Sequence, residues 1–218
     1  GSVRSLERDA VVQFNGALTD LAFFEGLEQV DGDLTLWGNP LISDLRALDS
    51  VQHIGGTLLI WSMAGLTELD LMPGLRHVGE NLHFLQNDSL THLTGFSSLE
   101  VVDGDVLIER HAELVTVNLA PNLLRVGKGF VASHNVKLAE LAGFDSVSSI
   151  GAGFQLMLNL ELVDVDVFGS VVQLSSVLRI QANLLLEACQ VDALASQFQF
   201  DESRVTVTID SNLDGTCQ

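Results

Sequence analysis

The ten residues VDGDLTLWGN (30–39) decide the fold, because similar sequences recur as VGENLHFLQN (78–87) and VDGDVLIERH (102–111). The second copy begins 48 residues after the first and the third begins 24 residues later (78 − 30 and 102 − 78). Self-similarity at a fixed period is the signature of a structural unit that is stacked many times. The whole chain therefore divides into blocks of 24 residues.

With Asp31 as position zero, blocks begin at 31, 55, 79, 103, 127, 151 and 175, and an earlier block begins near Glu7. Positions three and five of each block are almost always apolar, and this alternation predicts a short strand with two inward residues. Position three holds Leu34, Leu58, Leu82, Val106, Phe130, Phe154 and Leu178, and position five holds Leu36, Ile60, Phe84, Ile108, Ala132, Leu156 and Ile180.

Position eight carries a polar residue, usually asparagine, in nearly every block: Asn15, Asn39, Met63, Asn87, His111, Asn135, Asn159 and Asn183. Asparagine side chains can bond backbone groups of their own turn and of a neighbouring turn, which predicts a buried ladder that closes the strands. One block cannot bury its apolar residues alone, whereas stacked blocks with strands about 4.8 Å apart can. The sequence therefore predicts a mainly β solenoid of 24-residue coils.

Composition limits the partners. The chain has 218 residues, 47% of them apolar, which suffices for one domain with a sizeable core. The formal net charge of −19 argues against binding to nucleic acid, whose phosphates would be repelled. The sequence contains no run of about 18 apolar residues, so it predicts no membrane span. Residues 1–6 read as a tag remnant and N-terminal leader, and we expect any signal or anchor to have been removed.

The repeat sequence at 30–39, 78–87 and 102–111 resembles that of the receptor L domain. This domain is the right-handed single-stranded parallel β-helix of insulin-receptor and epidermal-growth-factor-receptor ectodomains and of bacterial surface proteins. The pattern differs from ordinary leucine-rich repeats in the residue beside the glycine and in the spacing after asparagine. The resemblance implies one solenoid over 7–218, without the cysteine-braced N-terminal cap of the receptors. It also implies a non-catalytic module, outside the cell or on its surface, including the bacterial surface or periplasm.

The C-terminal segment breaks the period and predicts a cap over 184–218. Residues 184–200 read as a short amphipathic helix, and 204–212 as a returning strand with Val207 and Ile209 inward. The solenoid class requires such a cap. Because the resemblance implies an oxidising compartment, we expect a disulfide between Cys189 and Cys217; two free thiols or a metal pair are the alternatives.

Carboxylates at position thirteen raise the question of a metal or an enzyme. Asp20, Asp44 and Glu68 occupy that position, and Asp70 lies two residues beyond Glu68. Calcium would relieve repulsion along such a ladder, but the dense oxygen cluster that calcium prefers is missing, and we expect no cofactor. His53 and His77 share a position in adjacent blocks, and no third zinc ligand lines up with them. The sequence contains no nucleophile–base pair in a context that indicates catalysis. A carbohydrate-active β-helix enzyme is therefore the third alternative, after the recognition module and the structural spacer.

The outward positions four and six of the strands carry an apolar patch where polar residues are usual. The candidate binding residues are Trp37, Trp61, Leu59, Leu85 and Leu107, with Thr35, His83 and Glu109 beside them. Such a patch usually marks a partner site. We expect a protein or glycan partner there, and self-association is also compatible. The alternative is a structural spacer whose patch packs on another domain.

The expected disulfide is directly testable. If Cys189 and Cys217 pair, the native protein should contain no titratable thiol, and the closed loop should stabilise the C-terminal cap by about 3 kcal/mol in the chain-entropy model. Thiol titration before and after reduction, with hydrogen exchange of the cap, measures both. Two reactive thiols in the unreduced native protein would contradict the pairing.

Overall fold

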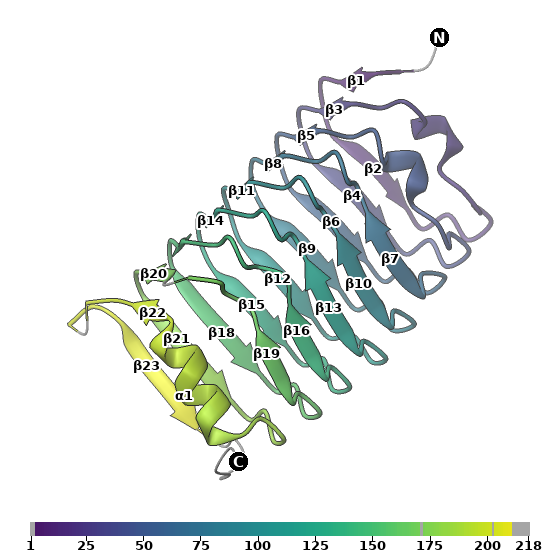
Figure 1. Cartoon of the computed structure of the whole chain (residues 1–218). Coiled ribbons are helices and arrows are strands. Elements are labelled where there is room, and N and C mark those ends of the chain that lie inside the picture. The colour runs from purple at the N-terminus through teal and green to yellow at the C-terminus, as the bar shows by residue number, and fades with distance from the viewer. Residues whose placement is uncertain (1–2, 171, 202, 211–218) are drawn as a thin grey trace.

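The computed structural model describes residues 3–170, 172–201 and 203–210, and these form a parallel β-solenoid (Figure 1). Strands in successive coils pair in parallel with partners 24 residues apart through most of the chain, as in Leu36 with Ile60 and Ile60 with Phe84. The predicted solenoid and its period are therefore confirmed. No helix among the described residues is long and apolar enough to cross a membrane.

Three sheets run along the solenoid, which we call sheets A, B and C. Sheet A contains β1 (Ser5–Leu6), β3 (Gln29–Val30), β5 (His53–Ile54), β8 (His77–Val78), β11 (Val101–Val102), β14 (Arg125–Val126), β17 (Ser149–Ile150), β20 (Val172–Leu174) and β22 (Phe198–Gln199). Sheet B contains β2 (Ala10–Gln13), β4 (Leu34–Trp37), β6 (Leu58–Trp61), β9 (Leu82–Leu85), β12 (Val106–Glu109), β15 (Phe130–Ser133), β18 (Gly153–Met157), β21 (Val177–Gln181) and β23 (Thr206–Asp210).

Sheet C is shorter and contains β7 (Glu68–Leu71), β10 (His92–Gly95), β13 (Thr116–Leu119), β16 (Glu140–Ala142) and β19 (Asp164–Asp166). The first two coils instead carry 3-10 turns at this place, η1 (Ala22–Phe24) and η2 (Arg46–Leu48). Asp20 accepts the backbone N–H of Ala22 at 3.1 Å, and Asp44 accepts that of Arg46 at 2.8 Å. These carboxylates satisfy N–H groups at the start of each turn, as helix-capping residues do.

The two ends of the solenoid differ in detail from the sequence analysis. Strand β1 lies within the segment that was assigned to a leader, and it pairs with β3 as the first strand of sheet A. At the other end, α1 (Ala188–Ser196) confirms the expected cap helix. In β23, Val207 and Ile209 align with the inward Leu178 and Ile180.

The predicted inward register of the returning strand is therefore confirmed, although Val207 and Ile209 are 47% and 43% exposed. The physical reason for this exposure is their place in the fold. Strand β23 is the last strand of sheet B among the described residues, and its side chains pack against a coil on one side only.

The core is built from apolar columns that run through all coils. The position-three and position-five residues of sheet B are buried, and so are the inward residues of sheet A, such as Ile54 and Val78. Phenylalanines fill the space toward the C-terminal half, where Phe130, Phe144 and Phe154 make ring contacts with centroids 4.8–5.4 Å apart. No coil is stable alone, because each column is shielded only by the coils above and below.

The position-eight ladder is formed as the sequence predicts. Asn87 shows the pattern: its Nδ2 donates to the carbonyl of Ile60 at 3.0 Å, and its Oδ1 accepts the N–H of Met63 at 2.9 Å. The same donation, from position eight to a carbonyl 27 residues earlier, is made by Asn39, His111, Asn135, Asn159 and Asn183. Every one of these side chains is buried, so the ladder satisfies backbone groups that water cannot reach.

His111 replaces asparagine in this ladder without breaking it. Its Nδ1 accepts the N–H of Asn87 at 3.1 Å, and its Nε2–H donates to the carbonyl of Phe84 at 3.1 Å. A neutral imidazole with its proton on Nε2 thus reproduces the acceptor and the donor of an amide. Burial lowers the pKa of His111 to about 4, and the carbonyls of Asn87 and Phe84, which both accept hydrogen bonds from the protonated ring, oppose that shift only in part.

This burial predicts acid sensitivity that one substitution should remove. The pKa of His111 is about 4 in the folded protein and about 6.5 without the fold, so the unfolded chain takes up the proton first. The stability that neutral His111 contributes is present above pH 6.5 and is lost between pH 6.5 and 4. His111→Asn should reduce the loss of unfolding free energy between pH 7 and 4.5 by on the order of 2–3 kcal/mol. Urea unfolding of both proteins at the two pH values measures this, and equal losses would contradict it.

The central core column provides a second test. Phe84 is fully buried, so Phe84→Ala should lower the unfolding free energy by about 3–5 kcal/mol through lost transfer energy and the remaining cavity. Phe23→Ala is the matched control, because Phe23 is 56% exposed and should lose much less. Equal losses for the two variants, measured by urea unfolding, would show that the column is not a packed core.

Candidate functional site

The outer face of sheet B carries all eight residues that the sequence analysis selected, and we call this surface the sheet B face. Thr35, Leu59, His83 and Leu107 align in one column through consecutive strand pairs, and Trp37, Trp61, Leu85 and Glu109 align in the next. All eight are half-buried. The 24-residue register thus places side chains that are far apart in the chain directly beside one another.

An aromatic row lies on this face. The indoles of Trp37 and Trp61 stack with centroids 4.4 Å apart and planes 1° apart, and the ring of Phe14 packs on Trp37 with centroids 4.2 Å apart. The Nε1–H of Trp61 donates to Oε1 of Gln86 at 2.8 Å, which fixes the orientation of that indole. We call Phe14, Trp37 and Trp61 the aromatic row.

The sequence analysis missed Phe14 and Gln86. Both occupy position seven, one residue after the outward column, and both have a left-handed backbone with φ of 54° and 50°. This conformation recurs at the end of nearly every sheet B strand. Glycine serves at the same position in the second coil, where a Cβ on Gly38 would lie 2.9 Å from the ring of Phe14. Gly38 is therefore the sequence signal that could have revealed the Phe14–Trp37 contact.

His83 and Glu109 give the sheet B face its polar character. His83 lies between Leu59 and Leu107 in its column, and its Nε2 is buried without a hydrogen-bond partner among the described residues. Burial lowers the pKa of His83, although the carboxylates of Asp105 and Glu109 oppose the shift. An uncharged imidazole is therefore favoured between the leucines.

Glu109 takes part in a serine–histidine–carboxylate contact that resembles a catalytic arrangement in composition only. Ser133 Oγ donates to Glu109 Oε1 at 2.6 Å and lies 3.2 Å from Nδ1 of His134. In a nucleophilic triad the histidine lies between serine and carboxylate, whereas here serine is in the middle. Ser133 is also only 1% exposed. The contact orients Glu109 at the edge of the sheet B face.

The four calcium candidates are split between two places on the surface. Asp20 and Asp44 line a shallow depression with Arg46, whose guanidinium bonds Asp44 and holds the pKa of that carboxyl below its usual range. Glu68 and Asp70 lie apart from that depression, in β7 of sheet C. Within the described residues, no group of three or more His, Cys, Asp or Glu side chains is placed to hold a metal ion.

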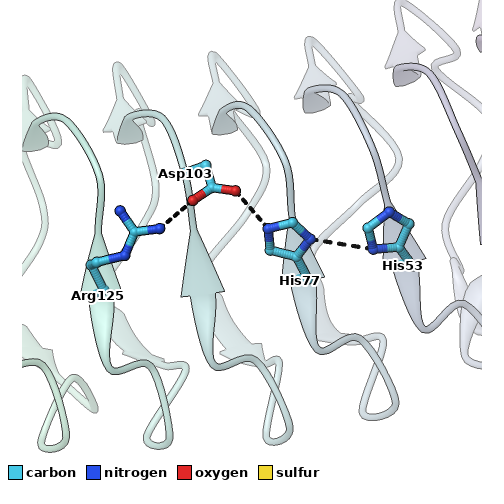
Figure 2. Close-up of polar contacts among 4 residues, drawn as sticks. All are labelled: His53, His77, Asp103 and Arg125. Atoms are coloured by element: carbon cyan, nitrogen blue, oxygen red, sulfur yellow. Dashed lines mark hydrogen bonds and ion pairs between the residues drawn. The ribbon is translucent and has the colours of Figure 1, made fainter.

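A second feature is a polar row on the outer side of sheet A, formed by His53, His77, Asp103 and Arg125 (Figure 2). Nδ1 of His77 lies 3.3 Å from Nδ1 of His53, and Nε2 of His77 lies 2.7 Å from Oδ2 of Asp103. Arg125 forms an ion pair with the other oxygen of Asp103. The hydrogen bond from His77, with help from Arg125, lowers the pKa of Asp103 against the opposing effect of burial.

Comparisons with protein-family models, with curated proteins and with solved structures gave no match to this chain. Cys217, the expected disulfide partner of Cys189, lies outside the described residues, and that pairing stays a prediction.

Proposed function

We propose that this protein is a non-catalytic recognition module, similar to receptor L domains, that binds a protein partner through the sheet B face. The observation that carries the proposal is the aromatic row, in which two stacked, parallel indoles and a phenylalanine lie on the outer side of a regular sheet. An extracellular or cell-surface location belongs to the same proposal, and the resemblance of the repeat sequence to receptor L domains supports it.

The aromatic row is suited to binding because it is already ordered. Stacking and the Trp61–Gln86 hydrogen bond hold both indoles in one orientation, so a partner would not have to restrict them further. Tryptophan is also the residue most enriched among binding hot spots. Covering apolar surface contributes roughly 25 cal/mol per Å², and Phe14, at 62% exposed, leaves much of its ring available.

The same geometry favours a protein partner over a glycan. Sugars bind aromatic side chains by stacking on a free ring face. Trp37 has Phe14 packed on it from the preceding coil and Trp61 stacked on it from the following coil. Trp37 thus presents mainly its edge, which suits apolar side chains of a protein surface.

The net negative charge of the chain indicates which charged residues a partner would carry. The chain carries a formal −19, and Asp105 and Glu109 lie near His83 on the sheet B face. Complementary potentials speed association and reject wrong partners. We therefore expect a partner with an apolar centre and basic residues around it.

The test compares the wild-type chain with the double variant Trp37→Ala, Trp61→Ala. Immobilised protein is exposed to the extracellular protein fraction of the source organism, retained proteins are identified, and each Kd is measured by surface plasmon resonance. Removing the two indoles should weaken binding at least 30-fold, since even one hot-spot residue contributes about 2 kcal/mol or more. The unfolding free energy should fall by only about 1–3 kcal/mol, since the rings are half-buried.

Leu124→Ala with Val136→Ala is the matched control, because both side chains are exposed and apolar but lie off the sheet B face. This control should bind like the wild type. Equal binding by the tryptophan double variant would place the recognition surface elsewhere. Retention of glycans on an array, with no retained protein, would overturn the proposed partner class.

A further inference from the structure

The polar row on sheet A contains a pair of histidines whose ring nitrogens face each other. His53 in β5 and His77 in β8 are direct partners in the parallel register, one coil apart. Their Nδ1 atoms are 3.3 Å apart, and their ring planes differ by 26° (Figure 2). Imidazole nitrogen is a principal ligand of zinc and related divalent ions.

The spacing fits a tetrahedral ion. Two Zn–N bonds of about 2.0–2.1 Å that span the 3.3 Å between the Nδ1 atoms enclose an N–Zn–N angle of roughly 105–110°. That is close to the tetrahedral angle. The ion would replace the hydrogen bond that the two rings otherwise share.

Asp103 supplies the outer support that metal-bound histidines normally have. Its Oδ2 lies 2.7 Å from Nε2 of His77, so the proton of a neutral His77 lies on Nε2 and the lone pair of Nδ1 faces His53. A histidine ligand almost always donates its other N–H to a carboxylate or carbonyl in this way. Arg125 holds Asp103 through the second carboxylate oxygen.

The backbone beneath this pair is held firmly. Ile54 and Val78, the residues that follow the two histidines, are fully buried, and sheet A continues on both sides through β3 and β11. The two imidazoles are therefore carried by paired, anchored strands. A rigid scaffold with an ordered outer shell is what holds a binding geometry in place.

We propose that His53 and His77 bind one divalent transition-metal ion of the Zn²⁺ class through their Nδ1 atoms, with Asp103 as a positioning residue. Nitrogen ligands select such ions over Ca²⁺ and Mg²⁺, which prefer oxygen. Since a tetrahedral ion takes four ligands, the remaining two positions accept water or a donor from outside the chain. The site lies on sheet A and is distinct from the sheet B face.

The chain offers an internal control among its other histidines. His92 lies in β10 of sheet C, and its Nδ1 is 2.7 Å from the hydroxyl of Thr116. It is exposed, as a metal site requires, but no second histidine accompanies it in its strand register. His92→Gln thus removes an imidazole without touching the pair.

The test is isothermal titration of ZnCl₂ into the chelator-treated, untagged 218-residue chain at pH 7.5. One ion per chain is expected, and His53→Gln or His77→Gln should weaken binding at least tenfold while His92→Gln leaves it unchanged. Circular dichroism confirms that each variant is folded. No uptake of Zn²⁺ by the wild type, or equal uptake by the His53→Gln and His77→Gln variants, would overturn the proposal.

Asp103→Asn tests the positioning role separately. It should weaken Zn²⁺ binding about tenfold, in the range found for outer-shell carboxylates. Long-range ¹H–¹⁵N spectra of the imidazoles should show His77 with its proton on Nε2 in the wild type and a shift of the Nδ1 signals of both histidines when Zn²⁺ is added. Unchanged affinity and an unchanged His77 tautomer in Asp103→Asn would overturn the role of Asp103.

Discussion

The buried position-eight ladder fixes the register on which the rest of the structure depends. Apart from Asn15 and Met63, each ladder side chain donates to a carbonyl 27 residues earlier and accepts an N–H 24 residues earlier, so it connects consecutive coils at one defined offset. A slip by one residue would leave these buried backbone groups unpaired and would turn the apolar column outward. The ladder therefore favours one register over its neighbours more strongly than non-directional apolar packing alone.

A fixed register converts sequence distance into spatial contact. Trp37 and Trp61 stack, and His53 and His77 face each other, because residues 24 positions apart occupy the same place on adjacent strands. The core is insensitive to what the outward columns carry, since their side chains do not enter it. The solenoid can thus hold an apolar surface on sheet B and a polar row on sheet A without a conflict between them.

Features that recur in every coil could be predicted from the sequence, whereas contacts that occur at one place only could not. The period, the inward columns, the asparagine ladder and the alignment of the indoles all follow from counting, because every coil repeats the same constraint. The contact of Asp103 with His77 does not, since Asp103 is 26 residues away and lies outside the regular register. Likewise, the exposure of Val207 and Ile209 depends on where the stack of described coils ends, which an alternating pattern cannot express.

The incomplete step of the ladder at Met63 has a consequence for how the coils hold together. Met63 offers Asn39 only a thioether sulfur at 3.8 Å, so the interface between the coils that begin at 31 and 55 lacks the amide or imidazole that, at later steps such as Asn87 and His111, bonds backbone groups of the preceding coil. The stability of a solenoid is approximately the sum of the intrinsic stabilities of its coils and the interaction energies between neighbouring coils. The interaction between these two coils is weaker in the buried interior, where the ladder bonds are missing. The Trp37–Trp61 stack crosses the same interface on the outside. A partner seated on that stack would tie the N-terminal coils to the rest, so occupancy of the surface and cooperativity of folding would be linked through one interface.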